Sequence, residues 1–470
     1  MRKPAKLFLA LTMILPLAVK AAPVSSHEPE AYLDLWQLYR NTMESDPRIG
    51  GADAQITASQ GQEDSAFGQL LPQLSGGASA SRIKRTQGAQ GNQPAQTQFY
   101  DGKTYSLNLT QALYNPAAWR GFKKYAELTK QYRSLAEDTR IQSAADLVQR
   151  YFAALAAEDE LELATAERKA TQRNLDSVSA LFDRQLATIT DKLQLSARVD
   201  SLKTAEIEAK NQIQVTREAL AELIGRDIYQ PFKRIDDRTL FTALPGSETD
   251  WVQSAIVHNP ALRAKQEALN SAEYAVSEAK AGHLPTLSLQ FGAQRSDFAY
   301  DNVIAASTID TYSASLNLQI PIYSGGSVSA RTRSLYGSQE SAEEDYEAVR
   351  RQVVKETKTA YLKSFASLSK IESSRNALNS AIKSREASEK SFSFGAVTAV
   401  DVLNAVRQEY SARRDYLRAQ YDFITNQLVL LRWSGDFKDA DIQRINSWLT
   451  VPNPDETRKT GLKPEEADKS

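Results

Sequence analysis

The 470-residue sequence predicts a mixed α+β membrane protein in which strands alternate with unusually long helices. Three observations support this fold class: the chain is duplicated, each half has segments with an alternating apolar pattern, and each half has a long uninterrupted helical pattern. No segment beyond the N-terminus approaches the ~18 apolar residues of a membrane-spanning helix. If the mature chain spans a membrane, it must therefore do so with strands.

The composition excludes several function classes. Lys and Arg number 57 and Asp and Glu number 58, so the net charge of -1 gives no reason to expect nucleic acid as a partner. The absence of Cys excludes disulfides, thiolate metal sites and lipidation on an N-terminal Cys. The three His residues lack metal-ligand spacing, and no Walker loop, GxSxG, HExxH or EF-hand motif is present. We therefore expect no enzyme, cofactor or metal site.

The two ends of the chain have distinct compositions. Residues 1–21 predict a secretory signal peptide, because Arg2, Lys3 and Lys6 precede an apolar run and small residues follow it near Ala21. The apolar run is too short for a transmembrane anchor. Residues 451–470 are rich in Pro, Lys and Glu and predict a disordered tail.

The chain between these ends is a tandem duplication. Landmarks recur in the same order at an interval of about 210 residues, which indicates a first repeat over residues 22–240 and a second over 241–450. The matching landmarks are Leu71 with Leu284, Ser106 with Ser315, Thr188 with Thr398, Asp191 with Asp401, Leu193 with Leu403, and Gly225 with Gly435.

Each repeat is expected to contain a helix followed by two strands. Apolar and polar residues alternate over residues 100–114, 284–296 and 311–323, and the Gly- and Ser-rich residues within 72–86 fit a weak first strand. Such a pattern fits either a soluble sheet with one wet face or barrel strands with one lipid-facing side. Four strands have open edges that a bilayer cannot satisfy, so in a membrane several chains must combine their strands into one closed barrel.

Each repeat continues as a long helical hairpin, over residues 116–225 and 327–435. Asn115 and Pro116 are typical of the N-cap and first position of a helix. Apolar residues then recur at steps of 3 and 4, as in a coiled coil. A helix of about 70 residues is ~100 Å long and must pack along neighbouring helices.

The far turn of each hairpin interrupts the helical pattern with few polar residues. In the second repeat, Gly395 can supply the permissive backbone of the reversal, and Thr398 and Asp401 can cap the returning helix. In the first repeat, the equivalent turn contains Gln185 and Thr188.

These segments resemble the TolC family of outer-membrane channels for efflux and type I secretion. The resemblance rests on four segments, covers residues 33–449, and includes the duplication. The segments are Gly282–Leu287, Pro321–Gly326, Gly395–Leu403 and Tyr421–Leu428.

The resemblance implies a homotrimer in the outer membrane of a Gram-negative bacterium. In this family, a twelve-stranded β-barrel in the lipid continues as a periplasmic coiled-coil α-barrel, with an equatorial helix that corresponds here to residues 439–449. The trimer would be a passive exit duct for small molecules or proteins. A periplasmic adaptor and an inner-membrane pump of the ABC, RND or MFS type would open it at its tip.

The resemblance also places a periplasmic gate at the hairpin tips. Asp401 falls on an acidic position that lines the constriction, and Asn404 stands where a second Asp is frequent. Thr190 and Asp191 match the turn of the first repeat that helps to hold the tip closed. Two tip residues depart from the family pattern: Gln185 stands where Gly is usual and Val397 where a basic residue is usual. The tip turns thus comprise Gly395, Val397, Thr398, Gln185 and Thr188.

Two alternatives stay open at this point. Asp401 could serve only as a helix cap, and the two roles are compatible. The chain could instead be a trimeric coiled-coil structural or adhesive protein of the cell envelope, although a stalk needs no repeated strand pairs. The sequence does not distinguish drugs from proteins as the exported substrate.

Overall fold

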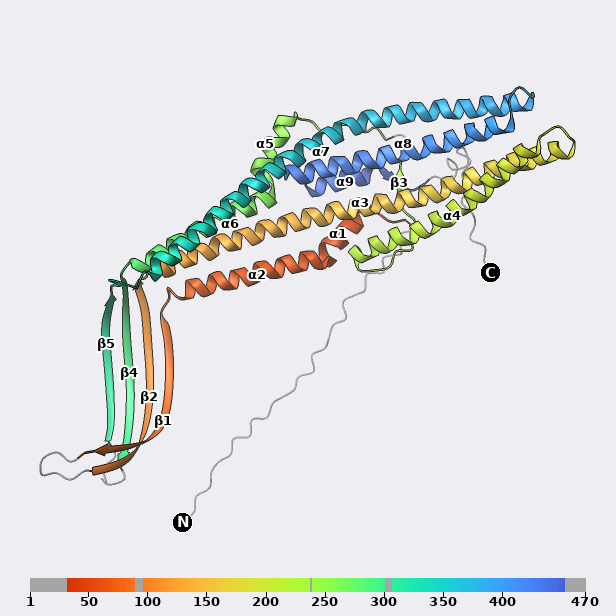
Figure 1. Ribbon diagram of the computed structural model, residues 1–470. Coiled ribbons are helices and arrows are strands. Elements are labelled where there is room, and N and C mark those ends of the chain that lie inside the picture. The colour runs from red at the N-terminus through yellow and green to blue at the C-terminus, as the bar shows by residue number, and fades with distance from the viewer. Residues whose placement is uncertain (1–31, 89–95, 237–238, 301–306, 453–470) are drawn as a thin grey trace, which may run out of the picture.

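The computed structural model describes residues 32–88, 96–236, 239–300 and 307–452. The expected signal peptide and all but the first two residues of the expected tail lie outside these ranges. A four-stranded sheet forms one end of the molecule, and long helices run from it to two hairpin tips at the other end (Figure 1).

The sheet is antiparallel and has the strand order β1-β2-β4-β5. Each repeat contributes one hairpin, and pairing of β2 with β4 joins the two hairpins. The strands are β1 (Gln73–Gln87), β2 (Gln96–Tyr114), β4 (Thr286–Tyr300) and β5 (Ser307–Gln319). The last strand ends before residues 320–323, contrary to the expected range, and Pro321 cannot donate a ladder hydrogen bond there.

The two faces of the sheet differ in polarity, because side chains alternate along each strand. The polar face is crowded: a Cβ added at Gly77 or Gly292 would lie 2.9 or 2.8 Å from the hydroxyl of a serine on the neighbouring strand. Cross-strand register places the large apolar residues together on the opposite side, which we call the apolar face. Its members include Leu74, Leu107, Leu109, Leu289, Phe291, Tyr312, Leu316 and Leu318.

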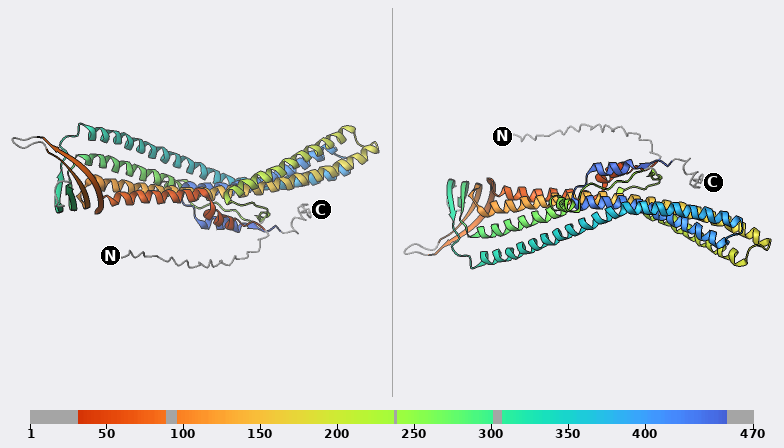
Figure 2. Two further views of the ribbon diagram at one scale, coloured as in Figure 1. Left: turned by 90° about the horizontal axis from the view of Figure 1, so that it is seen from below. Right: turned by 90° about the horizontal axis from the view of Figure 1, so that it is seen from above.

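Long helices pack side by side in a single curved layer (Figures 1 and 2). Near the sheet, contacts between neighbours give the order α2-α3-α6-α7, and toward the tips the order becomes α7-α8-α3-α4. These helices are α2 (Pro47–Gly68), α3 (Pro116–Asp183), α4 (Ile189–Ile224), α6 (Pro260–Lys280), α7 (Ser327–Ser393) and α8 (Ala399–Ser434). As expected, Pro116 is the first residue of α3, and the side chain of Asn115 accepts a hydrogen bond from the Ala118 N–H at 3.0 Å.

Shorter elements cover the middle of this layer. They surround the main apolar core, in which Tyr151, Phe232 and Phe423 are fully buried. The elements around this core are α1 (Leu35–Ser45), β3 (Arg234–Ile235), α9 (Asp439–Ser447) and β6 (Leu449–Thr450), whereas α5 (Glu248–His258) packs on α7 and the 3-10 turn Ala281–His283 connects α6 to β4. In the described ranges, the helices are all too polar or too short in apolar length to cross a bilayer.

Candidate functional site at the hairpin tips

The two hairpin tips have the same backbone geometry. In each, the long helix ends in a Schellman motif, in which the residue at C′ is left-handed and two backbone N–H groups turn back to the last helical carbonyls. The bonds are Gln185 N to Phe182 O (2.8 Å) and Leu186 N to Leu181 O (2.9 Å) in the first tip, and Gly395 N to Phe392 O (2.9 Å) and Ala396 N to Ser391 O (3.0 Å) in the second.

The residue at C′ differs between the tips. Gly395 has φ 72°, and Gln185 has φ 63° at the equivalent position, where an L side chain is strained. Gln185 is the only non-glycine residue with positive φ among the residues described. The departure seen in the sequence at Gln185 is therefore accommodated without a change of backbone.

Each returning helix begins with a Thr and an Asp that hydrogen-bond to each other. The Thr398 hydroxyl and backbone N–H donate to Asp401 Oδ2 at 2.7 and 2.8 Å, and the Asp401 N–H donates back to the Thr398 hydroxyl at 3.3 Å. This is a capping box, with Thr398 as the N-cap. In the first tip, the Thr188 hydroxyl likewise donates to Asp191 at 2.8 Å and accepts from the Asp191 N–H at 3.1 Å.

These hydrogen bonds affect the ionisation of Asp401. The side-chain hydrogen bond from Thr398, followed by its backbone N–H, lowers the pKa of the Asp401 carboxyl below its ordinary value. Asp401 is therefore a carboxylate at neutral pH in the single chain, and it caps the helix while remaining exposed.

The other predicted site residues lie around these boxes. Asn404 is exposed one turn after Asp401, while Val402 and Leu403 between them are buried. Thr190 is exposed at the start of α4, and Val397 is half-buried in the second turn. Asp401 and Asn404 thus share the solvent-facing side of α8 in the single chain.

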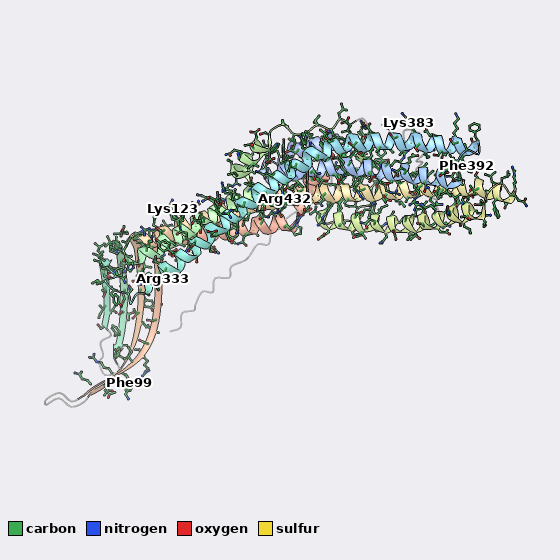
Figure 3. The ribbon with its side chains drawn as sticks, turned by 45° about the horizontal axis from the view of Figure 1, so that its top comes forward. Phe99, Lys123, Arg333, Lys383, Phe392 and Arg432 are labelled. Carbon is green, nitrogen blue, oxygen red and sulfur yellow. The ribbon has the colours of Figure 1, made fainter. Side chains whose placement is uncertain are left out.

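A small apolar cluster joins the two tips. Its buried members are Val178 and Leu195 from the first hairpin and Ala399 and Leu403 from the second. Phe392, labelled near the far end of α7 in Figure 3, packs against it. The structure therefore brings the two predicted gate turns together as one packed unit.

Behind the tips, a buried carboxylate connects three helices, and the sequence analysis did not identify it. Glu167 of α3 is fully buried and forms ion pairs with Arg198 of α4 and, at 3.1 Å, with Arg414 of α8. Arg414 also contacts Glu160 at 2.8 Å. The spacing of residues in α3 could have indicated its burial. Glu167 follows the buried Leu163 by four residues and therefore lies on the same, core-facing side of the helix.

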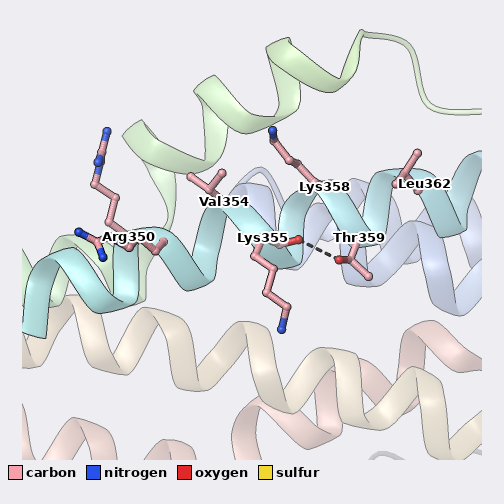
Figure 4. Close-up of a pocket in the computed structure, with 7 residues that line it drawn as sticks. Arg350, Val354, Lys355, Lys358, Thr359 and Leu362 are labelled. Carbon is pink, nitrogen blue, oxygen red and sulfur yellow. Dashed lines mark hydrogen bonds between the residues drawn. The ribbon is translucent and has the colours of Figure 1, made fainter.

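A basic groove of about 570 Å³ runs along α7 (Figure 4). Arg350, Arg351, Lys355 and Lys358 line it. Several of these cations have local partners: Lys358 lies 3.6 Å from Glu248 of α5, and Lys355 lies 2.9 Å from Glu356. The groove lies on the outer helix of the layer. Over the described parts of the chain, no three His, Asp or Glu side chains are grouped so as to hold a metal ion.

Comparison with known proteins agrees with this geometry. Residues 38–226 and 251–436, one segment in each repeat, match the outer membrane efflux protein family. The outer membrane protein TolC of Vibrio cholerae is 29% identical over 93% of this chain and 99% of its own length. The alkaline protease secretion protein AprF of Pseudomonas aeruginosa is 28% identical over 88% of this chain and 86% of its own length.

Solved structures have the same fold. The outer membrane protein VceC of Vibrio cholerae superposes with a TM-score of 0.75 at 18% identity, over 85% of this chain and 96% of that one. The predicted resemblance and the α+β channel fold are therefore confirmed, as are the expected outer-membrane location and the export-channel function. Two matched segments in tandem and relatives aligned along almost their whole length leave one conclusion: the chain belongs to the outer membrane efflux protein family.

Proposed function

We propose that three copies of this chain form a closed duct through the outer membrane that continues into the periplasm. The observation that carries the proposal is the open four-stranded sheet with one apolar face. Strands β1 and β5 each have a single neighbour within the described sheet. Because a bilayer cannot satisfy unpaired backbone groups, the β1 edge of one copy must pair with the β5 edge of the next.

The need for a duct supports three copies over two. A barrel of about eight strands has an interior that side chains fill, whereas larger barrels leave an aqueous channel. Three chains supply twelve strands, with the polar face toward the lumen and the apolar face toward lipid.

The same symmetry places the helices around the axis of the duct. Helices α7 and α4 form the two outer edges of the layer toward the tips, so α7 of one copy packs against the neighbouring copy. The exposed side chains of Leu362 and Phe365 would be covered in this contact. The basic groove on α7 lies along the same edge.

The gate lies at the tips in this proposal. Asp401 and Asn404 of three copies surround the axis, and Asp191 and Thr190 hold neighbouring hairpins together. Three carboxylates that face one another raise each other's pKa or recruit cations, which opposes the effect of the capping hydrogen bonds. An adaptor and a pump of the ABC, RND or MFS type engage the tips and release the gate.

The names of the relatives suggest which classes of cargo the duct transports but not the individual molecules. AprF is named for secretion of a protease, and the family is named for efflux, so small molecules and proteins are both candidate cargoes. The pump selects the cargo, and this chain provides the exit.

Planar-bilayer recording of the purified chain tests the duct and the gate together. We expect a trimer that dissociates only on heating in detergent, ion conductance, and block by divalent cations. Asp401→Asn retains a cap acceptor but removes the charge, so block should weaken, whereas Asn404→Asp should strengthen it. A monodisperse monomer without conductance would refute the duct, and unchanged block in both variants would refute the gate.

A further inference from the structure

On the apolar face, the apolar run of every strand ends in a charged residue. The three same-face positions that precede it toward the helices carry only apolar or small residues in each strand. Counted away from the helices, the first charged residues are Arg82 in β1, Lys103 in β2, Arg295 in β4 and Asp310 in β5.

The register shows that these four residues lie along one inclined line. Arg295 of β4 is directly opposite Asp310 of β5 and, on its other side, directly opposite Tyr105 of β2. Lys103 lies two residues farther from the helices than Tyr105. On β1, Ala78 is opposite Tyr105, and Arg82 lies four residues farther from the helices than Ala78. Four residues correspond to about 13 Å along a strand, and three strand spacings to about 14 Å across the sheet. The line is therefore inclined by about 40° to the hydrogen-bonding direction, which matches the ~35–45° tilt of barrel strands. In the proposed barrel, these residues therefore form a ring at one depth, in a plane parallel to the membrane.

Positive charge gathers at the β1–β2 end of this line. Arg82, Lys84 and Lys103 lie on the apolar face, and Asp101 is the only carboxylate on that face of these two strands within the described residues. Asp101 lies 3.9 Å from Arg82.

The lysines of this end differ from Arg295 in their partners. The guanidinium of Arg295 is held by both oxygens of Asp310 at 2.7 Å. Lys84 lies 5.6 Å from the ring of Phe99, which Figure 3 labels at the far end of the strands. Lys103 forms no ion pair with any residue in the described ranges, although Asp297 is opposite it in register.

We infer that Arg82, Lys84 and Lys103 bind the phosphate groups of anionic lipids in the outer leaflet. This inference rests on the proposed membrane-spanning barrel. The aliphatic stems of these residues lie against the apolar face while their charged heads reach the headgroup level. Arg82 and Lys103 are diagonal neighbours, about 7–8 Å apart at the backbone, so both can reach one phosphorylated headgroup. Phe99 adds the aromatic side chain typical of a membrane interface.

The neighbouring Arg85 provides a matched control. It follows Lys84 in the same strand, and its side chain therefore belongs to the polar face that would line the lumen. Arg85→Gln removes the same charge as Lys84→Gln but leaves the apolar face unchanged.

The experiment uses the full chain assembled in nanodiscs of phosphatidylethanolamine and bisphosphorylated lipid A, with retained lipids counted by native mass spectrometry. The wild type should retain lipid A preferentially. Each cation near a headgroup contributes about 1 kcal/mol, or about fivefold, so Lys84→Gln with Lys103→Gln should reduce this preference by more than tenfold. Arg85→Gln should retain it.

Several outcomes would overturn the inference: no preference in the wild type, no loss in the double variant, an equal loss in Arg85→Gln, or full displacement of lipid A by millimolar inorganic phosphate. Conductance of each sample separates this failure from that of the duct. A conducting trimer without lipid preference refutes only the lipid site, whereas a wild type without trimer or conductance refutes the proposed function.

Discussion

At the scale of single residues, the two tips provide an internal comparison of one backbone motif with two different side chains. Gln185 and Gly395 occupy the same left-handed position, but only one of them is suited to it. A Cβ added at Gly395 would meet no atom within 4 Å, so a substitution there has only a backbone cost.

We expect Gln185→Gly to stabilise the first tip by about 1 kcal/mol and Gly395→Ala to destabilise the second by about 1–2 kcal/mol, because left-handed backbone is costly for residues with a Cβ. Hydrogen exchange at the amides of Leu186 and Ala396 would measure both effects locally. Destabilisation of the first tip by Gln185→Gly, or no destabilisation of the second tip by Gly395→Ala, would contradict the strain assigned to a side chain at this left-handed position.

A second residue-scale feature is the buried carboxyl of Asp159 in the main core. Burial raises the pKa of Asp159 to about 6, although Arg234 at 3.4 Å and the Tyr421 hydroxyl oppose this shift. Since the folded-state pKa exceeds the ordinary value of 3.8, the folded chain takes up a proton more readily than the unfolded chain.

The free energy of unfolding should therefore increase as the pH falls from about 6 toward 4, because the buried Asp159 carboxyl becomes neutral. Above pH 6 the carboxyl is ionised, and its destabilising effect should reach its full value. Asp159→Asn should stabilise the chain at pH 7.5, by at most about 3 kcal/mol, and make little difference at pH 4. Thermal unfolding across this range would show it. Asp422→Asn, which alters an exposed ion pair with Lys370, is the control and should change the free energy of unfolding by less than about 1 kcal/mol.

At the scale of elements, a buried ion-pair network joins the two hairpins behind the apolar cluster of the tips. Glu167 of α3 is fully buried, and its partners Arg198 of α4 and Arg414 of α8 come from both hairpins. A buried charge that loses its partners is strongly destabilising, so these contacts fix how the hairpins sit on each other.

Glu167→Ala should leave Arg198 and Arg414 without their shared partner. We expect it to reduce the local free energy of unfolding of α4 and α8 by about 3 kcal/mol. Glu222→Ala is the control, because its ion pair with Arg150 is exposed and should contribute less than about 1 kcal/mol. Local free energies from hydrogen exchange along α4 would distinguish the two. Similar values for both variants would remove the assigned role of Glu167.

The elements also show what the sequence could predict. Period-two alternation predicted three of the four strands, Gly- and Ser-rich composition predicted the first, and the match of Thr188 with Thr398 identified the tips. The burial of Glu167 and the left-handed Gln185 could not be predicted with certainty, because a charged residue in a long helix usually faces solvent and Gln rarely adopts positive φ. The early end of β5 was missed although Pro321 marks it.

At the scale of the whole molecule, the polarity of the two faces of the sheet determines which face of the proposed barrel contacts lipid and which lines the lumen. Leu107→Arg places a charge in the middle of the apolar face and should cost about 2–4 kcal/mol in a bilayer. Asn108→Arg lies one residue away on the polar face, so the trimer should still insert but conduct differently. Urea unfolding in lipid vesicles and bilayer conductance would measure these effects. Equal loss of insertion in both variants would contradict the assignment of the faces.

The gate residues illustrate the limit of a single chain. Asp401 could be recognised as a capping residue and as a candidate constriction from sequence, and the structure describes the capping box in atomic detail. In the proposed trimer, its role in the pore depends on the approach of three copies, which no pattern within one chain encodes.

The open edges of the sheet also matter before any duct exists. Within the described sheet, β1 and β5 each leave one strand edge unpaired beside an apolar face, and in a chain newly released into the periplasm this combination favours uncontrolled strand addition. In the proposed trimer, encounter with two further copies competes with this aggregation and becomes faster as the local concentration of chains increases. Pairing of β1 with β5 of a neighbouring copy in the proposed barrel covers both edges, so assembly itself removes the aggregation hazard that the single chain carries.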